Sequence, residues 1–356
     1  MSHDAPDSDA ASAKARVLAR ARELGFDAVA VARASTPIDA DFERYQAFVA
    51  GGMHGDMGFL AEHPEARARV DGPDILPGAR SVICLARLYQ RSDDASDDGL
   101  ARLVARYARG HDYHNGVRKK LRRLAAFVRS LGDDVRARPI CDEEPLLERA
   151  WAARAGLGFV GKNGLLIVPG LGSYVLLGEV VTTLALEPDS PIPERCGSCR
   201  LCLDACPTEA FVRPFVLDAR RCVAYLTIEQ RGDIPADLRA GVGEHLFGCD
   251  DCQTACPFTR GKRPAARTSM FAPLERWSTV TLSDLLAPDL ADRWPSIAEG
   301  SPLHRAGPHG LARNAAVVLG NRGDAAAVPA LRAAAVAHPS EVVRRAADWA
   351  ASRLCE

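Results

Sequence analysis

The sequence predicts a multidomain α+β protein, and three observations support this prediction. Helix-like and strand-like patterns mix through the first 190 residues, which is typical of an α/β domain. Eight of the eleven cysteines lie between Cys196 and Cys256, where their spacing replaces hydrophobic periodicity. Beyond residue 270 the chain becomes rich in alanine and helix-like. We therefore expect a disordered tail at 1–10, an α/β domain at 11–190, a ferredoxin-like domain at 191–265, and a linker with a helical domain at 266–356.

The elements of the first domain follow from periodicity and turn residues. ASAKARVLARARELG (11–25) has the apolar spacing of an amphipathic helix that ends at Gly25. Proline-rich EPDSPIPER (187–195) separates this domain from the cysteines. The other predicted elements are strands at 27–35, 81–89, 135–142, 164–170 and 174–186, helices at 116–131 and 145–155, and an acidic surface loop at 91–99.

The last domain is predicted to be entirely helical. Residues 310–354 read as three alanine-rich helices, broken at 320–324 and 338–340. Helix pairs with proline at a helix start and arginine in the second helix resemble HEAT-type repeats. Only about one and a half repeats are present, too few to stand alone, so we expect them to pack on the rest of the protein.

Composition limits the classes of function. The chain has 356 residues, 26% charged and 47% apolar, and its net charge of −1 argues against a general nucleic-acid binder. The charge is nevertheless uneven, because residues 100–130 hold nine Arg or Lys against the single Asp112, and 257–274 hold no acid. Such runs are either solvated helix faces or local polyanion-binding surfaces. A polar N-terminus and the lack of a long apolar segment predict a cytoplasmic protein outside the membrane.

The cysteines are spaced for iron–sulfur clusters. CGSCRLCLDACP, from Cys196 to Pro207, has the C-x2-C-x2-C-x3-C-P spacing of bacterial ferredoxins, in which the fourth cysteine serves the other cluster. CDDCQTACP, from Cys249 to Pro257, is a shorter echo of it, and Cys222 is the one further cysteine in the region. If the last cysteine of each run serves the cluster of the other run, the eight cysteines form two complete sets of four ligands. One [4Fe–4S] cluster is then bound by Cys196, Cys199, Cys202 and Cys256, and the other by Cys206, Cys222, Cys249 and Cys252.

Other uses of the thiols are weaker interpretations. Two structural zinc sites of four cysteines each remain an alternative, although zinc sites have no need of the crossed C-P arrangement. Of the three remaining cysteines, Cys84 and Cys141 are expected to be packed in the core, and Cys355 has no visible role. Gly156 to Gly161 match G-x-G-x-x-G, but a helix precedes them and a strand follows, so a dinucleotide site is excluded.

Several segments together resemble one enzyme family. YARGHDYH, CDEEPLLERAWAARAGLGFVGKNGLL, GSYVLLGEV, LDARRCVAYLTIEQRGDIPADLR and GEHLFGCDDCQTACP closely resemble epoxyqueuosine reductases, over roughly residues 10–356. The resemblance implies an N-terminal cobalamin-binding domain, two [4Fe–4S] clusters and a helical tail that helps to bind tRNA. It implies reduction of the epoxide of epoxyqueuosine to queuosine at the wobble position of tRNA, with electrons passing through the clusters to cobalamin. A reduced ferredoxin or flavodoxin as donor and a monomeric enzyme are expected.

The same resemblance implies roles for individual residues. Asp142 matches the family's proton donor, and a carboxyl group beside a corrin is expected to have a raised pKa. From the residues alone, Asp142 reads equally well as a helix N-cap. The residues implied to lie near cobalamin are Arg69, Asp142, Lys162, Asn163, Ile167 and Asp250. Those implied to contact substrate or tRNA are Tyr113, His114, Arg231, Arg260, Lys262 and Arg263.

The sequence also departs from the family pattern. Many relatives have small residues after the aspartate, whereas Glu143 and Glu144 follow Asp142 here and should raise its pKa if buried or repel phosphates if exposed. Two other functions remain open at this point. One is a reductive dehalogenase-like enzyme acting on a small molecule, and the other is a non-enzymatic electron-transfer or tRNA-binding module. The local basic runs and the helical tail favour the tRNA enzyme.

Overall fold

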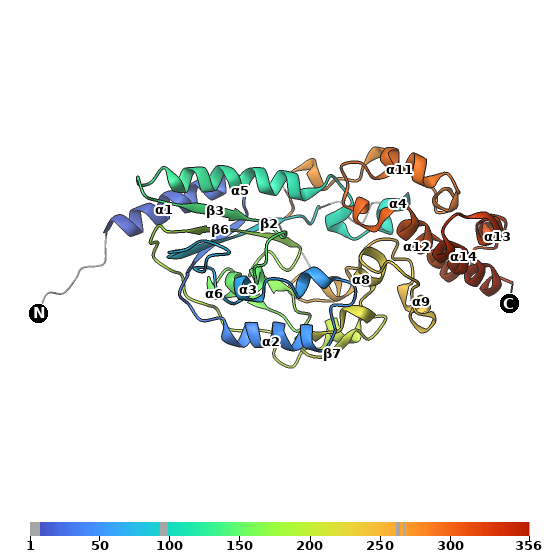
Figure 1. Ribbon diagram of the computed structural model, residues 1–356, viewed down its shortest axis with the longest axis horizontal. Helices are drawn as coiled ribbons and strands as arrows, with labels where there is room; N and C mark the ends of the chain where they lie inside the picture. Colours follow the sequence, from blue (N-terminus) through green and yellow to red (C-terminus); the bar gives the residue numbers. More distant parts are fainter. Residues whose placement is uncertain (1–7, 93–98, 261–263, 267, 356) are drawn as a thin grey trace, which may run out of the picture.

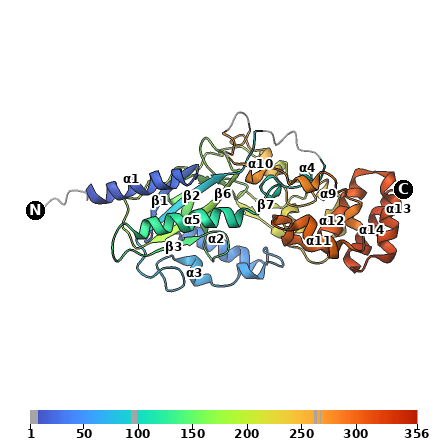
Figure 2. The same ribbon diagram turned by 90° about the horizontal axis from the view of Figure 1, so that it is seen from above.

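The fold is elongated, with a helix-covered sheet at one end, stacked helices at the other and the cysteine region between them (Figures 1 and 2). The structure is a computed structural model that describes residues 8–92, 99–260, 264–266 and 268–355. Most of the predicted tail and of the 91–99 loop lies outside the described residues. The first helix, α1 (Ser8–Glu23), begins three residues earlier than expected. None of the helices in the described ranges is long and apolar enough to span a bilayer.

A four-stranded sheet organises the first domain, in the order β1-β2-β6-β3. It contains β1 (Ala28–Arg33), β2 (Ser81–Leu88), β3 (Ala137–Ile140) and β6 (Val175–Thr182), and every neighbouring pair is antiparallel. The predicted mixture of helices and strands is confirmed, but it forms no parallel β-α-β units within this sheet. All eight residues of β2 are buried, because β2 is covered on both faces. This explains why its sequence reads as a continuous apolar run.

Helices cover both faces of the sheet, with α5 above the strands and α6 below them in Figure 1. Alternate β2 residues point to opposite sides, so Ile83 packs toward α1 and α5 (Tyr113–Arg129), and Val82 toward α6 (Glu148–Arg154). The approach of α5 depends on Gly178 in β6, where a Cβ atom would lie 2.7 Å from Leu121 Cδ1. Asp112 caps α5 by accepting a hydrogen bond from the backbone of His114 at 3.0 Å.

The remaining elements are mostly short. Between β1 and β2 lie α2 (Asp39–Ala50) and α3 (Pro64–Ala68), which periodicity did not predict; α2 buries no residue and therefore has no regular apolar stripe. The strand expected at 164–170 is reduced to β5 (Leu166–Ile167), paired with β4 (Phe159–Val160). The others are α4 (Gly99–Arg102), α7 (Leu201–Asp204), β7 (Phe211–Arg213), β8 (Val216–Leu217), α8 (Val223–Ile228), α9 (Ala236–Val242), α10 (Asp251–Thr254) and α11 (Leu290–Ala298).

The three predicted C-terminal helices are present as α12 (Gly307–Arg322), α13 (Val328–Ala337) and α14 (Glu341–Arg353). As expected, they pack on the rest of the protein, in one hydrophobic core with Leu226 and Phe247 of the cysteine region. Arg313 in α12 is 1% exposed and donates to the carbonyl oxygens of Gln230 and Gly232 at 2.7 and 2.6 Å. This guanidinium fastens the C-terminal helices to backbone carbonyls that would otherwise be buried without a donor.

Candidate functional site

The structure gathers the eight clustered thiols into two groups of four. In the first group, the charge of Cys256 acts on Cys202, which also interacts with Cys199 and Cys196. In the second, Cys249 interacts with Cys222 and Cys252, and both of these interact with Cys206. One further interaction, between Cys202 and Cys252, joins the groups. Each group offers four thiols, the number that a [4Fe–4S] cluster requires, and the assignment of individual cysteines to the two clusters stays a prediction from the spacing.

Side chains of the first domain hold the cysteine loops in place. Lys162 Nζ donates hydrogen bonds to the carbonyl oxygens of Gly197 and Cys199, the latter at 2.9 Å. Asn163 lies 3.5 Å from the carbonyl oxygen of Cys252. Ile167 is buried against Cys256. These three residues were expected beside cobalamin, and the contacts that the structure shows for them are to the thiol-bearing loops.

Asp250 and Arg69, also expected near the cofactor, have different surroundings. Asp250 is 7% exposed and accepts hydrogen bonds from the backbone and guanidinium of Arg106 at 2.8 and 3.2 Å. It therefore ties the second group of thiols to the first domain. Arg69 is mostly exposed and forms a two-pronged ion pair with Asp71, at 2.8 and 3.0 Å.

Asp142 lies in a small polar cluster at the start of α5. Its carboxylate accepts a hydrogen bond from the Tyr113 hydroxyl at 2.8 Å and lies 3.2 Å from His114 Nε2. The other ring nitrogen of His114 lies 2.7 Å from Asp112. The Asp142 side chain is 55% exposed, so it can reach a bound molecule. It does not cap α6, whose N-cap is Leu147, and the N-cap interpretation is therefore wrong.

The pKa of Asp142 shifts in the direction opposite to the one expected from the sequence. The hydrogen bond to His114 lowers the pKa of Asp142, and the Tyr113 hydroxyl lowers it further, although desolvation opposes both. Desolvation would lower the pKa of His114, but hydrogen bonds to Asp112 and Asp142 raise it to about 9. The expected raised pKa of Asp142 is therefore wrong, because a cationic histidine occupies its neighbourhood. At neutral pH the cluster is an imidazolium–carboxylate pair, with its mobile proton on His114.

Of the two extra carboxylates of this loop, Glu143 has its charge paired with a cation and, among the described residues, Glu144 does not. Glu143 forms an ion pair with Arg118 on α5. Glu144 lies 3.3 Å from the backbone nitrogen of Cys141, within hydrogen-bonding distance. Cys141 itself is buried, as is Cys84, which confirms the packing expected for both thiols.

An aromatic side chain lies between the Asp142 cluster and the second group of thiols. Tyr107 packs edge-to-face on Tyr113, with ring centroids 6.0 Å apart. Burial raises the pKa of Tyr107, and the charges of both Asp250 and Asp142 raise it further, so this ring is within electrostatic reach of both sites. Tyr107 also packs on Phe247, two residues before Cys249, with ring centroids 6.5 Å apart, so it connects the Asp142 cluster to the segment that begins the second cysteine run.

The residues expected to contact RNA are dispersed. Arg231 lines a cavity of about 300 Å³ beside the first turns of α12 and α14 and donates to the carbonyl oxygen of Arg305 at 2.9 Å. Arg260 is exposed and donates to the carbonyl oxygen of Thr254 at 3.1 Å. Lys262 and Arg263 lie outside the described residues. A larger concavity of about 470 Å³ runs along α5, lined by Asn115, Arg118, Lys119, Arg122, Arg123 and Ala126.

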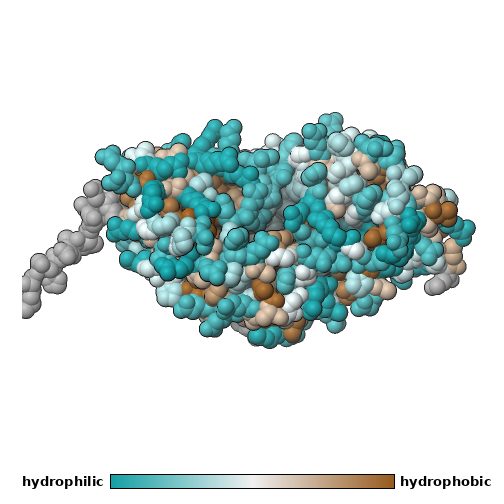
Figure 3. Space-filling model, viewed as in Figure 1, coloured by the Kyte–Doolittle hydropathy of each residue, from teal (hydrophilic) through white to brown (hydrophobic). Residues whose placement is uncertain are grey.

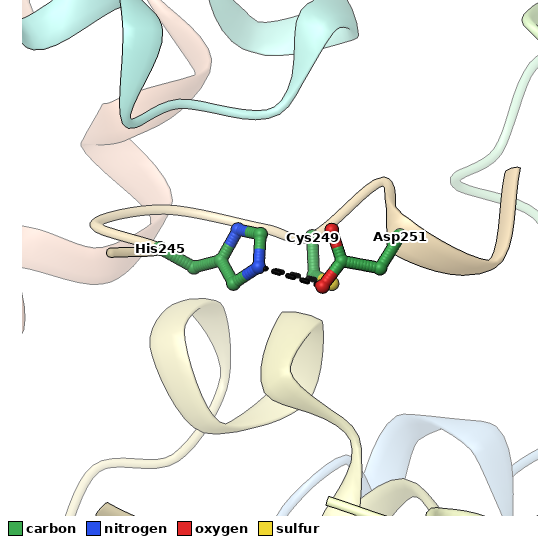
Figure 4. A group of neighbouring side chains, drawn as sticks. All are labelled: His245, Cys249 and Asp251. Atoms are coloured by element: carbon green, nitrogen blue, oxygen red, sulfur yellow. Dashed lines mark hydrogen bonds and ion pairs between the residues drawn. The ribbon is translucent and has the colours of Figure 1, made fainter. Parts of the chain in front are cut away.

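One polar group beside the thiols was not predicted from the sequence. His245 Nε2 lies 3.0 Å from the Asp251 carboxylate and 3.7 Å from Cys249 Sγ (Figure 4). Their three ligand atoms lie within 4.8 Å of one another, close enough to hold a metal ion. His245 and Asp251 have no spacing signal of their own, and only the position of Asp251 inside C-x2-C pointed to this region.

Comparisons with known proteins agree with this site. Residues 195–259 match the family model of a 4Fe-4S double cluster binding domain, and residues 69–143 match the model described as epoxyqueuosine reductase QueG, DUF1730. The epoxyqueuosine reductase of Gloeobacter violaceus is 42% identical over 324 residues, which cover 88% of this chain and 98% of the relative. The chain belongs to the epoxyqueuosine reductase family. It is therefore an oxidoreductase with a domain for two [4Fe–4S] clusters, which disfavours the zinc interpretation.

Solved epoxyqueuosine reductases share the fold. One bound to an epoxyqueuosine-modified tRNA-Tyr stem loop is 32% identical, with a TM-score of 0.87 over 97% of this chain and 91% of that chain. Another, from Bacillus subtilis, has its catalytic loop swung out of the active site and gives a TM-score of 0.86 at 32% identity, covering 96% and 90%. The recognition of this family from sequence segments is confirmed.

The raised pKa of His114 predicts a stability change in alkaline solution. A pKa raised from 6.5 to about 9 means that the stabilisation is fully present below pH 6.5 and is lost as pH rises through about 9. Thermal unfolding of the anaerobic protein between pH 6 and 10 should show this loss, and His114→Gln should abolish it. The exposed His111→Gln variant is the control and should unfold like the wild type. An unchanged pH dependence in His114→Gln would contradict the assigned ion pair.

Proposed function

We propose that this chain reduces epoxyqueuosine in tRNA to queuosine. The reaction takes two electrons and two protons, breaks both C–O bonds of the epoxide, forms a carbon–carbon double bond and releases the oxygen as water. The observation that carries the proposal is the half-exposed Asp142–His114 pair, which aromatic contacts of Tyr107 with Tyr113 and Phe247 connect to the segment that begins the second cysteine run. Family membership supports the same substrate, because relatives are named for this reaction and one is solved with the modified stem loop.

We assign the two groups of thiols as the crossed ligand sets of the two clusters. Cys196, Cys199, Cys202 and Cys256 would hold the first cluster, and Cys206, Cys222, Cys249 and Cys252 the second. The electrostatic contacts within each group support this division. The second group adjoins Asp250 and Tyr107, so electrons would pass from the first cluster to the second and then toward Asp142.

The exchange of Cys206 and Cys256 between the two cysteine runs predicts which cluster is lost when a given cysteine is replaced. Cys256→Ser should lower the iron content from about eight toward about four per chain, because each cubane contains four irons. The remaining cluster should give the electron paramagnetic resonance signal found in Cys199→Ser. It should differ from the signal of Cys252→Ser, although Cys252 is near Cys256 in sequence.

Cys355→Ser is the matched control, since this exposed thiol lies outside both groups. It should keep all the iron. A Cys256→Ser signal that matched Cys252→Ser would show that the two runs are not interlocked.

We propose cobalamin as the third redox group, located between Asp142 and the second cluster. Bound cobalamin in its Co(I) state supplies a two-electron reductant that one-electron clusters cannot provide in a single step. The polar groups around this position fit such a cofactor: Asp142 is half exposed, while Asn163 and Asp250 are buried and fixed by protein contacts. These fixed residues would form the wall of the site, and Lys162 and Ile167 would support that wall from behind. Arg69 stays a proposed contact.

The protein's own proton donor is the Asp142–His114 pair. The imidazolium of His114 is within reach of the Asp142 carboxylate, which in turn is exposed toward substrate. We propose that the proton of the His114 imidazolium reaches the departing epoxide oxygen through the Asp142 carboxylate, and that solvent supplies the second proton of the reaction and restores the imidazolium. Tyr113 orients the carboxylate through its hydroxyl.

Turnover of epoxyqueuosine-containing tRNA tests the function directly. Anaerobic protein with both clusters, a strong reductant and added cobalamin should form queuosine, and omitting cobalamin should abolish the product. Asp142→Asn should lower kcat by roughly 10²–10⁴, as expected for loss of a general acid. Its iron content should stay at the wild-type level. Full activity in Asp142→Asn would refute the proton-donor assignment.

A basic surface beside the site supports tRNA as the substrate. The concavity along α5 starts at Asn115, next to His114, and continues through Lys119 and Arg122. Hydrophilic side chains dominate the upper edge of the molecule in Figure 3, over α5. We propose that this stripe binds the phosphate backbone and that the HEAT-like helices α12–α14, with Arg231, contact the same RNA. Arg260, Lys262 and Arg263 are proposed as further contacts.

Removal of this charge should weaken binding of tRNA. The triple variant Lys119→Gln, Arg122→Gln and Arg123→Gln should raise KM for tRNA and reduce the salt dependence of binding by about one phosphate per lost contact. A matched triple on α1, Arg16→Gln, Arg20→Gln and Arg22→Gln, removes equal charge from the same domain and should leave KM unchanged. Equal effects of both triples would show that only net charge matters.

We also propose an electron donor, an oligomeric state and a cellular location for the enzyme. Leu201, beside Cys202, and Phe215, whose backbone nitrogen donates to the carbonyl of Lys162, are exposed apolar residues near the first group of thiols. This surface suits contact with a reduced ferredoxin or flavodoxin. We propose that the enzyme works as a monomer, and a tRNA substrate supports a cytoplasmic location.

A further inference from the structure

The backbone of Asp142 has an unusual conformation that needs support. Its φ angle is 61°, in the left-handed region that non-glycine residues rarely adopt. The side chain is held from α5 by Tyr113 and His114. The backbone N–H is held from the other side, where it donates to Glu148 Oε1 at 3.0 Å. Glu148 is the first residue of α6, so two helices clamp Asp142 between them.

Behind Glu148 lies a second carboxyl group with no evident purpose in the fold. Glu179 stands in the middle of β6, opposite Cys84 of β2 and Ile140 of β3, and is 0% exposed. Within the described part of the chain neither of its carboxyl oxygens accepts a hydrogen bond from an N–H or hydroxyl group, and the polar side chain that faces it is the carboxyl group of Glu148. An ionised carboxylate in this position would be costly, because the sheet interior offers it neither water nor a paired cation.

The two carboxyl groups influence each other strongly. Desolvation, followed by the charge of Asp142, raises the pKa of Glu148 to about 7. Desolvation and the adjacent Glu148 carboxyl raise the pKa of Glu179 well above its usual range. Asp142 and Glu144 add negative potential at Glu179, while Arg149 opposes the effect at Glu148. The nearby thiols of Cys84 and Cys141 stay protonated, since burial raises the pKa of each.

We propose that Glu148 and Glu179 form a carboxyl pair that shares a proton and positions Asp142 for proton transfer. This inference rests on the proposed role of Asp142. With its own proton in place, Glu148 can donate to Glu179 and remain beneath the loop, where its other oxygen accepts the Asp142 N–H. Two adjacent negative charges cannot both stay there. Loss of the Glu148 proton, as pH rises through about 7, drives this partly exposed side chain toward solvent and releases the Asp142 backbone.

Two substitutions of Glu148 test whether its side chain positions Asp142 or only fills space beneath the loop. In Glu148→Gln the amide oxygen can still accept the Asp142 N–H, and the NH2 group can donate to Glu179, so the variant imitates the proton-sharing pair. It should keep kcat near the wild-type value and lose the fall in kcat that the wild type shows as pH rises through about 7. Glu148→Ala should lower kcat by roughly ten- to a hundredfold, the cost of a misplaced catalytic group. Its KM for tRNA should not change.

Glu65→Gln is the matched control, because it removes an exposed carboxylate from α3 of the same domain and leaves the hydrogen bonds that hold Asp142 in place. It should keep both kcat and the pH profile of the wild type. If Glu148→Gln retained the fall near pH 7, or if Glu148→Ala kept full kcat, the pair would not position Asp142.

A measurement without turnover separates this inference from the proposed function. A pKa raised from 4.5 to about 7 means that the stabilisation is complete below pH 4.5 and is lost as pH rises through about 7. The thermal unfolding temperature of the wild type should therefore fall over this interval, and that of Glu148→Gln should fall less. If no variant reduced epoxyqueuosine but this difference appeared, the proposed function would fail and the proton-sharing pair would stand. An identical pH dependence of unfolding in both proteins would overturn the pair.

Discussion

The ion pair between Asp250 and Arg106 is the interaction on which the site most depends. Asp250 stands between Cys249 and Cys252, and it receives both the backbone N–H and the guanidinium of a residue from the first domain. Arg106 also lies over the Tyr174 ring, 4.9 Å from its centroid. A nearly buried carboxylate tolerates this position only with such donors. The pair therefore fixes the distance between the thiol loops and the domain that presents Asp142.

The thiols and the proton-handling residues occupy two separate regions of the site. The thiol groups occupy the middle of the molecule, where hydrophobic packing and lysine-to-carbonyl bonds hold their loops. The proton-handling residues occupy the edge, where Asp142 is half exposed and its charge is balanced by an imidazolium. Tyr107 separates the two regions while it remains in the field of both. A redox centre and an acid can thus work on the same substrate without sharing ligands.

Sequence reasoning succeeded where function imposes fixed spacing. The C-x2-C runs located the double-cluster domain, and apolar runs located β2 and the C-terminal helices. It failed where the decisive partner is distant in the chain. The pKa of Asp142 is set by His114, which is 28 residues away in sequence and arrives with the first turn of α5. Glu179 looked like an ordinary strand residue, since only the sheet register and α6 bring it to Glu148. The helix α2 escaped detection because it buries no side chain.

The proposed crossing of ligands would also affect how the protein matures. In this arrangement each cluster takes ligands from both cysteine runs, so neither ligand set would be complete until residues 196–206 and 249–256 have met across the intervening segment. Closing that loop costs chain entropy, which cofactor binding would then offset. Cofactor insertion would thus act as a late folding step that joins two distant segments simultaneously. A chain cut between the runs could not keep one finished centre on each fragment, so the region is a single unit of assembly despite its two halves.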